Sequence, residues 1–353
     1  MKRILVVDFN GTSSVYTHYL SNGLKGKDCE VEILGKRKKM FLDVFSKTNQ
    51  YLGVKTGIKL LDYVLNWFWL LLNYKKYDAI IIQWLQLLKY IDIEIQLISY
   101  LQKRIPLIYI VHNLYPHNSN SIIIKGRYNS LYKTCKNVAV QTNEIKNSIK
   151  KIAPNKNLLR INHGLFFREF RERQLNSNFS KCLMIGYISK YKGVEDAIEV
   201  VKMLKEQNII VSLEVIGLGK PEYISQLNQM IEEFRITDEV KIQAIEVPTQ
   251  FLINKINKSA MLWLPYKEIS QSGVAYTAMG LGTPIVAYDV GNFKEVFSNK
   301  SIAEIVDKGD LTGFCFAVRK VLENTNNYKK SIRELYTDDL WDENKVIIKE
   351  FLG

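Results

Sequence analysis

The stretch that decides the fold is "SQSGVAYTAMGLGTPIVAYDVG", residues 270–291. Within it, residues 273–282 predict a helix and residues 283–289 predict a buried β-strand, and another apolar strand-like run comes just before. Ser272 and Gly273 stand at the expected start of the helix, where unpaired backbone N–H groups and the positive end of the helix dipole attract anions. Because glycine has no side chain, an anion can approach the backbone closely there. The stretch therefore predicts a phosphate-binding turn between two parallel strands.

The same alternation of strand-like and helix-like segments runs through the rest of the chain. Apolar runs predict strands at residues 3–8, 28–34, 79–84, 106–112, 138–142, 158–164, 182–189, 211–217, 239–245, 260–266 and 283–289. Helix-length segments separate them, for example residues 193–207 and 223–236. Strands that alternate with helices predict parallel sheets built from βαβ units.

A polar stretch near residue 175 separates two such series, so we expect two doubly wound α/β domains. The first is an N-terminal Rossmann-like domain at residues 1–170. The second is a Rossmann-like domain at residues 171–335. Residues 336–353 predict a C-terminal helix that packs back on the first domain. In such sheets the ligand lies at the carboxyl ends of the strands, so the residues after each strand matter most.

Cysteine spacing and the N-terminal segment predict a cytoplasmic protein. Cys29, Cys135, Cys182 and Cys315 stand far apart with no C-x-x-C pair. This spacing argues against zinc ribbons and disulfide scaffolds and fits a reducing compartment. The first segment, "MKRILVVDFNG", has an apolar run that is too short for a signal peptide and predicts a first strand.

Positive charge is concentrated in the first half of the chain, which has 353 residues and a formal net charge of +13. Residues 1–175 contain 28 lysines and arginines against 12 acidic residues, a balance of +16, whereas residues 176–353 contain 21 against 24, a balance of −3. This asymmetry favours an anionic partner for the first domain. No groove-reading motif accompanies the charge, so we expect an anionic membrane surface and no nucleic acid.

The segment "IKLLDYVLNWFWLLLN", residues 58–73, is apolar and contains Trp67 and Trp69. Lys59 and Asp62 interrupt it, and it is too short and too mixed to span a membrane. Two alternatives remain open: a helix that lies on the membrane surface, and a buried helix of the first domain. In either case we expect a helix whose aromatic end reaches the surface.

Five motifs, taken in order, resemble the GT-B glycosyltransferases of group 1, the family 4-like enzymes of bacterial polysaccharide synthesis. They are "YIVHNLYPH" (109–117), "INHG" (161–164), "IGYISKYKGVEDAIEVVKML" (185–204), "VIGLG" (215–219) and "TAMGLGTPIVA" (277–287). Gly291 and Glu295 follow where the family has a glycine and an acidic residue. The resemblance covers nearly the whole chain and implies the GT-B fold, in which two Rossmann-like domains face a central cleft.

Residue types and the resemblance together give the candidate site residues. The catalytic candidates are His112 and Lys192; the donor-binding candidates are Gly11, Lys190, Gly217, Glu268, Ser272, Gly273 and Thr277; the acceptor or cleft candidates are Asn10, Asn113, His117 and His163. The resemblance implies that Lys192 contacts the donor diphosphate. A histidine at a strand's carboxyl end, such as His112, can act as a base, contact the sugar or anchor a loop.

The sequence departs from the family pattern at the donor helix. The E-x7-E pair of many relatives would fall at Ile269 and Thr277, so both glutamates are missing, and Glu268 is one position off. In the family the second glutamate holds the nucleotide ribose, and Thr277 could supply one hydrogen bond in its place. The family arginine before K-G falls at Tyr187. These changes leave the donor and the retaining or inverting stereochemistry open.

The chemistry requires cations or backbone donors around the departing diphosphate. No Asp-x-Asp follows a strand, since "IDIE" (91–94) lies in a helical pattern, so we expect a metal-independent, hexosyltransferase-like enzyme with no cofactor. We expect it to use a nucleotide sugar and a glycan or lipid-linked acceptor in cell-surface polysaccharide synthesis, at the inner face of the cell membrane. Two alternatives remain: a GT-B-fold nucleotide-sugar epimerase, and a catalytically weak partner subunit of another transferase.

Overall fold

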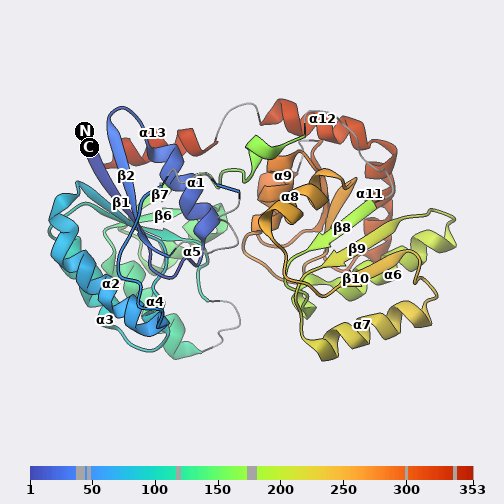
Figure 1. Cartoon of the computed structure of the whole chain (residues 1–353), viewed down its shortest axis with the longest axis horizontal. Helices are drawn as coiled ribbons and strands as arrows, with labels where there is room; N and C mark the ends of the chain where they lie inside the picture. Colours follow the sequence, from blue (N-terminus) through green and yellow to red (C-terminus); the bar gives the residue numbers. More distant parts are fainter. Residues whose placement is uncertain are drawn as a thin grey trace. The chain divides into compact units, whose positions relative to one another are not determined.

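The structure is a computed structural model that describes residues 1–36, 44–45, 49–116, 121–172, 181–298, 301–336 and 340–352. The chain forms two compact units, one of Met1–Gly164 with Asp339–Gly353 and one of Leu165–Asp338. The sequence analysis placed this boundary after residue 170. Each unit is a parallel sheet covered by helices (Figure 1), so the predicted α/β class with two doubly wound domains is confirmed.

The first unit contains a seven-stranded sheet in the order β3-β2-β1-β4-β5-β6-β7, with every pair parallel. Its strands are β1 (Lys2–Asp8), β2 (Cys29–Gly35), β3 (Tyr51–Leu52), β4 (Ala79–Ile82), β5 (Leu107–Val111), β6 (Asn137–Val140) and β7 (Asn157–Arg160). Its helices are α1 (Ser14–Leu24), α2 (Lys59–Asn73), α3 (Ile93–Leu101), α4 (Ile122–Thr134), α5 (Asn143–Ile152) and α13 (Leu340–Leu352), with short 3₁₀ helices η2 (Tyr74–Lys76) and η3 (Leu87–Lys89).

Helices cover both faces of this sheet, which explains why its central strands are apolar throughout. On β1, Leu5 and Val7 pack into the core shared with α2, α3, α4 and α5. Ile4 and Val6 alternate with them and are equally buried. Figure 1 shows α1 beside α13, away from α2, α3 and α4.

The second unit contains a six-stranded parallel sheet in the order β10-β9-β8-β11-β12-β13. Its strands are β8 (Lys181–Ile185), β9 (Ser212–Ile216), β10 (Val240–Gln243), β11 (Met261–Leu264), β12 (Ile285–Tyr288) and β13 (Ala303–Val306). Its helices are α6 (Val194–Glu206), α7 (Pro221–Glu233), α8 (Thr249–Asn257), α9 (Gly273–Leu281), α10 (Phe293–Phe297), α11 (Leu311–Glu323) and α12 (Thr325–Leu335), with 3₁₀ helices η4 (Arg168–Phe170) and η5 (Lys190–Lys192).

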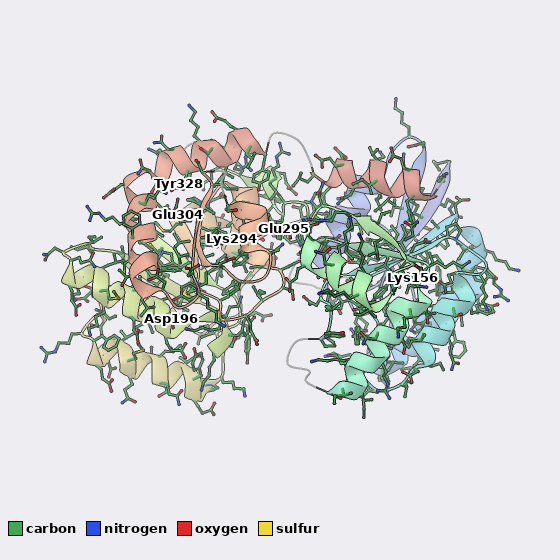
Figure 2. All side chains as sticks on the ribbon, turned by 180° about the vertical axis from the view of Figure 1, so that it is seen from behind. Lys156, Asp196, Lys294, Glu295, Glu304 and Tyr328 are labelled. Carbon is green, nitrogen blue, oxygen red and sulfur yellow. The ribbon has the colours of Figure 1, made fainter. Side chains whose placement is uncertain are left out.

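The core of this unit is built mainly from α6, α7 and α11 against the sheet, with Trp263 and Phe314 wholly buried in edge-to-face contact. The edge strand β13 is tied to the helices by polar side chains. Tyr328 of α12 donates to a carboxylate oxygen of Glu304, and Lys320 lies 2.9 Å from the same oxygen (Figure 2).

The eleven strands predicted from apolar runs are all present, and two further strands went unpredicted. β3 has only two residues, paired through Ile33↔Tyr51 and Leu34↔Leu52, which is too short to create a pattern. β13 is an edge strand whose residues after Ala303 are only half-buried, and Glu304 interrupts its apolar run. Edge strands lose the continuous apolar signal because water reaches one side of them.

The predicted aromatic helix is α2, and its aromatic end reaches the surface through Phe68, whereas Trp67 is buried. Trp67 is 4% exposed and Trp69 is half-buried against the core, whereas Phe68 between them is 58% exposed. Successive residues on a helix point in directions about 100° apart, so a buried tryptophan leaves its neighbour outside. In the part of the chain that the structure describes, no helix has the length and apolar character needed to cross a membrane.

The C-terminal helix α13 completes the first unit. Trp341 is buried there, and a Cβ added at Gly164 would lie 2.1 Å from its ring. The side chain of Asn344 bonds the backbone of Asn162 twice, accepting from its N–H at 2.7 Å and donating to its carbonyl at 2.8 Å. A segment at the far end of the sequence is therefore held on β7 and α1 by packing and by paired hydrogen bonds.

Candidate functional site

In the second unit the loops after β8, β11 and β12 meet at one edge of the sheet. These strands are neighbours, and the carboxyl ends of parallel strands lie together, which is where ligands bind in such sheets. Two glycines let the loops touch: a Cβ at Gly193 would lie 1.9 Å from Pro265 O, and a Cβ at Gly291 would lie 2.2 Å from Ile269 O. The N–H of Lys267 also donates to Tyr191 O at 2.7 Å. The loops thus form one continuous surface in front of α9.

The glycine at the start of α9 and the glycine near its end are present for different physical reasons. Ser272 is the N-cap residue, and its Oγ accepts from the N–H of Ala275 at 3.3 Å. A Cβ at Gly273 would meet only the ring of Phe166, at an ordinary 3.7 Å. A Cβ at Gly280 would lie 1.9 Å from Phe166 O. Packing within the unit therefore requires glycine at position 280. At position 273 packing would allow a side chain, so the glycine there has another reason.

Lys192 supplies the cation of this surface. Its Nζ donates to the phenol oxygen of Tyr266 at 2.9 Å and lies 4.1 Å from the centre of that ring. Burial disfavours the charged amine, but contacts with Tyr266 and Tyr191 outweigh this and raise the pKa of Lys192 above its usual value. The amine is therefore charged at neutral pH.

The neighbouring Lys267 differs, because its charge is already neutralised. Its Nζ forms an ion pair with Asp196 on α6, which Figure 2 labels. The same carboxylate accepts from the hydroxyl of Tyr288 at 2.8 Å. Of these two lysines, Lys192 is the one placed to hold an added anion.

The other predicted donor-binding residues of this unit differ in how readily they could contact a ligand. Lys190 and Glu268 are exposed on their loops. The hydroxyl of Thr277 donates to Gly273 O at 2.8 Å, so its lone pairs remain free to accept while its proton is engaged. The N–H of Gly217 donates to Gln243 O at 3.0 Å, and a Cβ there would lie 1.9 Å from Gly186 O. Close packing of two loops therefore accounts for glycine at 217.

Gln271, which the sequence analysis did not select, precedes the N-cap of α9. Its Nε2 is buried and has no hydrogen-bond partner among the described residues. A buried amide donor without a partner costs free energy, so such a group is commonly completed by a ligand or a water. Its position in the loop after a strand was the only signal in the sequence.

The first unit has a cavity of about 630 Å³ at the carboxyl ends of β1, β4 and β5. The predicted residues Asn10, His112 and Asn113 line it together. The side chain of Asn10 donates to Gln86, which in turn donates to the hydroxyl of Thr12 at 3.0 Å. The structure thus brings two of the four predicted acceptor or cleft residues, Asn10 and Asn113, into one cavity with the catalytic candidate His112.

His112 is held by a chain of hydrogen bonds that fixes its tautomer. Nε2 of Gln83 donates to the hydroxyl of Thr17 at 2.9 Å, and that hydroxyl donates to Asp8 at 3.1 Å. The carbonyl oxygen of Gln83 therefore faces His112, 3.1 Å from its Nε2, so Nε2 carries the proton. The ring stacks on Trp84, with the ring centres 4.9 Å apart. Gln83 is a positioning residue that the sequence analysis missed, although it directly follows β4.

Burial lowers the pKa of His112 to about 3, with a smaller contribution from the nearby His163. The imidazole is therefore neutral at physiological pH and is a weak base. Its Nδ1 lone pair is an acceptor for a hydroxyl group, which fits a polar contact better than proton abstraction.

Gly11 and the start of α1 are arranged around Asp8. The carboxylate of Asp8 accepts from the N–H groups of Thr12 and Ser13 at 2.9 and 3.0 Å, so it already occupies the N-terminal donors of that turn. Gly11 has φ +61°, and a Cβ there would lie 2.4 Å from Lys36 O. Backbone conformation and packing therefore require glycine at this position.

Of the other two predicted histidines, His163 is not among the described residues that line this cavity. His163 lies against Tyr16 and Trp341, with Nδ1 2.9 Å from Gly164 O, and burial lowers its pKa to about 4. His117 lies outside the described residues.

A buried acid supports the cavity wall. Glu94 is wholly buried and accepts hydrogen bonds from the hydroxyl of Tyr63 and, at 3.3 Å, from Nε1 of Trp67. Tyr63 lines the cavity, and its hydroxyl also accepts from the N–H of Gln86 at 2.9 Å. Burial raises the pKa of Glu94 to about 7. The segment "IDIE" is therefore the start of α3, with its glutamate in the core.

Residues 166–337 match the family described as glycosyl transferases group 1. The match covers 172 of the 353 residues, nearly the whole of the second unit, so this unit has the sequence pattern of a group 1 glycosyltransferase. No curated protein sequence matches the chain.

Solved structures give the fold of the whole chain. Sucrose-phosphate synthase from Thermosynechococcus elongatus is similar at a TM-score of 0.74 and 14% identity, over 99% of this chain and 98% of that chain. The Anabaena protein HepE in complex with UDP-glucose is similar at 0.71 and 14%, over 99% of both chains. The lipopolysaccharide outer core galactosyltransferase WaaB is similar at 0.64 and 14%, over 99% of this chain and 100% of that one. The predicted GT-B fold is confirmed.

Proposed function

We propose that the protein transfers a hexose from a nucleotide-diphosphate sugar to a glycan or lipid-linked acceptor in cell-surface polysaccharide synthesis, without a metal ion or cofactor. The observation that carries the proposal is Lys192. It is a charged amine hydrogen-bonded to the phenol hydroxyl of Tyr266, which lies in the loop that leads from β11 to α9. A cation and free backbone donors are what a departing diphosphate needs.

The reaction assigned to these groups is a displacement at the anomeric carbon. An acceptor hydroxyl oxygen bonds to that carbon, the carbon–oxygen bond to the diphosphate breaks, and the diphosphate leaves with the electron pair. An oxygen of the departing diphosphate takes up the proton of the acceptor hydroxyl. Lys192 and the amides at Gly273 stabilise the charge that develops on the leaving group. The buried amide of Gln271 is a further donor on the same loop. HepE, similar in fold, was solved with UDP-glucose, which supports a nucleotide sugar as donor.

The first unit binds the acceptor in this proposal. Asn10, His112 and Asn113 offer donors and acceptors that suit hydroxyl groups of a sugar. Neutral His112 accepts from the acceptor hydroxyl and orients it for attack. WaaB, also similar in fold, is a lipopolysaccharide outer core galactosyltransferase, which supports the polysaccharide assignment.

The positive first half of the chain supports peripheral binding at the inner face of the cell membrane. Each basic residue close to an anionic surface contributes on the order of 1 kcal/mol, and the attraction fades beyond a Debye length of about 8 Å. We expect the protein to sediment with anionic vesicles at low salt, to be released at high salt, and to bind neutral vesicles poorly. Because Trp67 is buried, Phe68 is the aromatic residue to substitute on α2.

The deciding experiment is a screen of nucleotide sugars for thermal stabilisation of the protein, followed by a transfer assay with the stabilising donor. A donor that stabilises the protein and loses its sugar to an added acceptor supports the proposal. Interconversion of two nucleotide sugars without any acceptor would indicate the epimerase instead. Stabilisation by none of them, with activity only in the presence of a second transferase, would indicate a partner subunit.

A further inference from the structure

The mouth of the first unit's cavity is bordered by exposed apolar side chains on two segments. One segment is the start of α2 and the other runs from η3 into α3. We call the six residues the apolar rim: Ile58, Leu60, Leu61, Tyr90, Ile91 and Ile93. Leu60 and Tyr90 line the cavity itself and are 63% and 71% exposed. So much apolar surface at one opening is typical of a binding surface.

The rim continues along the outer face of α2. Leu61, Phe68 and Leu72 are all exposed, and their spacing of seven and four residues places them on one side of the helix. The opposite side carries Trp67 and Leu70 into the core. A helix at a protein–water boundary normally presents polar residues outward, so α2 is apolar on the face where water is expected.

Lysines lie among these apolar residues. Lys59 and Lys89 are exposed and line the cavity next to Leu60 and Tyr90. Residues 51–136 contain 11 lysines and arginines against four acidic residues, and two of those four, Asp62 and Glu94, are buried. Apolar side chains with adjacent cations match an amphiphile whose anionic group is next to its apolar chain.

The third feature is the polar interior, where Asn10, His112 and Asn113 lie beyond the rim. An occupant that fits all three features has an apolar chain for the rim, an anion for Lys59 and Lys89, and hydroxyl groups for the interior. A free glycan would satisfy the interior and leave the rim exposed to water.

We propose that this cavity binds a membrane lipid that carries a phosphate next to its apolar chain, and that such a lipid, taken from the bilayer, is the sugar acceptor. The proposal rests on the proposed function and narrows its acceptor from glycan or lipid to a lipid phosphate. The outer face of α2 contacts the same bilayer, so the acceptor reaches the cavity without entering water.

The first test uses the full-length protein and phosphatidylcholine vesicles with or without dihexadecyl phosphate. The rim variant combines Leu60→Gln and Ile91→Gln. The matched control combines Ile210→Gln and Phe316→Gln, which are 78% and 69% exposed on the second unit. We expect wild type and control to bind only the phosphate-bearing vesicles. We expect the rim variant to lose at least about tenfold in affinity, because two apolar side chains no longer leave water. Binding by the rim variant equal to wild type overturns the proposal, as does equal binding to vesicles without the phosphate lipid.

The second test separates the cavity from the surface. Hexyl phosphate, below the concentration at which it aggregates, and methyl phosphate are titrated calorimetrically. We expect hexyl phosphate to bind wild type and to bind Lys59→Gln/Lys89→Gln at least about tenfold more weakly, as expected for the loss of charge-assisted hydrogen bonds. Methyl phosphate with the same affinity as hexyl phosphate would show an anion site without a chain site and contradict the proposal.

Nucleotide binding distinguishes failure of this inference from failure of the proposed function. The rim residues belong to the first unit and Lys192 to the second. A protein that binds a nucleotide sugar but neither vesicles nor hexyl phosphate keeps its proposed function and loses the lipid acceptor. A protein that binds no nucleotide sugar loses the proposed function, whatever its behaviour toward lipid.

Discussion

Nε2 of His112 donates a hydrogen bond to the side-chain carbonyl of Gln83, 3.1 Å away, and this contact sets the protonation of the imidazole. Because the amide of Gln83 is held from its other side by Thr17, the carbonyl cannot turn away. His112 is therefore presented as a neutral ring with Nδ1 as its acceptor.

Replacing His112 with alanine should lower turnover more than donor affinity. The side chain is placed to contact the acceptor, and losing one oriented hydrogen bond in the transition state slows the reaction by about tenfold or more. Steady-state kinetics with a saturating donor and calorimetric titration of the donor measure the two effects. A His112→Ala variant with wild-type turnover would assign His112 to loop structure. Gln83→Ala should also lower turnover, by a smaller factor.

The buried histidines should make the free energy of unfolding rise with pH. The pKa of His112 is lowered to about 3 and that of His163 to about 4, both from 6.5. Between these folded-state pKa values and the unfolded value of 6.5, the unfolded chain binds more protons than the folded one. This contribution is therefore complete above about pH 6.5 and is lost as the pH falls, by at most about 1.4 kcal/mol per pH unit for each histidine. The raised pKa of Glu94, about 7, gives an opposite slope between about pH 4.5 and 7 and offsets part of the effect. Urea unfolding from pH 7 to pH 5 should therefore show a smaller slope in His112→Asn than in wild type, because the Glu94 contribution is the same in both. Equal slopes would contradict the burial of the ring.

Lys192→Ala should weaken nucleoside diphosphate binding by about tenfold to a hundredfold, the range for a charge-assisted hydrogen bond. The fold should survive, because the variant removes a contact with Tyr266 and no packed apolar side chain. Lys241→Ala, an exposed lysine on β10, is the control and should bind as wild type does. Titration of UDP and other nucleoside diphosphates measures the effect. An unchanged affinity in Lys192→Ala would remove this residue from the site.

Gly273→Ala and Gly280→Ala should differ in kind. The first adds a methyl group to open space before α9, so we expect normal thermal unfolding with donor affinity lowered by about tenfold or more, through lost backbone contacts. The second forces a methyl group against Phe166 O, so we expect a lower unfolding temperature. Thermal unfolding with and without a nucleotide sugar separates the two outcomes. Destabilisation by Gly273→Ala with unaltered nucleotide binding would mean that the glycine serves packing alone.

Transfer activity should persist in excess EDTA. In the proposed mechanism Lys192 and the amides at Gly273 provide the positive potential that a divalent cation would otherwise supply. The assay compares initial rates before and after chelation, and again after adding magnesium or manganese. A rate that falls with EDTA and recovers with the ion would show a metal requirement.

The sequence predicts much of this architecture because the informative features are local. The nine central parallel strands are apolar on both faces and were visible as runs, as were the edge strands β7 and β10, while Glu304 hid the edge strand β13. Gly273 was selected because a Ser-Gly pair at a helix start has a direct physical meaning. Relationships across the fold were not visible. The contact between Gln83 and His112 joins residues that follow two different strands. Lys267 pairs with Asp196 because the loop after β11 approaches α6. Of Lys192 and Lys267, this pairing leaves Lys192 available to an added anion.

The aromatic segment shows a different limit. Its composition correctly predicts a helix with an apolar surface, yet the choice of outward residue depends on a rotation that composition does not determine. Glu94 fixes that rotation, because it accepts from both Tyr63 and Trp67 and draws them inward. Phe68 and Leu72 are left outside as a consequence.

The insertion of Trp341 against Gly164 has a consequence for the order in which the chain matures. Residues 165–338 are contiguous and can fold as soon as they leave the ribosome, while the earlier-made residues 1–164 lack α13. Until α13 arrives, α1 and the segment after β7 expose the apolar surface that Trp341 later covers. The half of the protein that is translated first is thus the last to be finished. The first unit must wait while the other half is synthesised, and during that time its uncovered apolar surface can bind a chaperone.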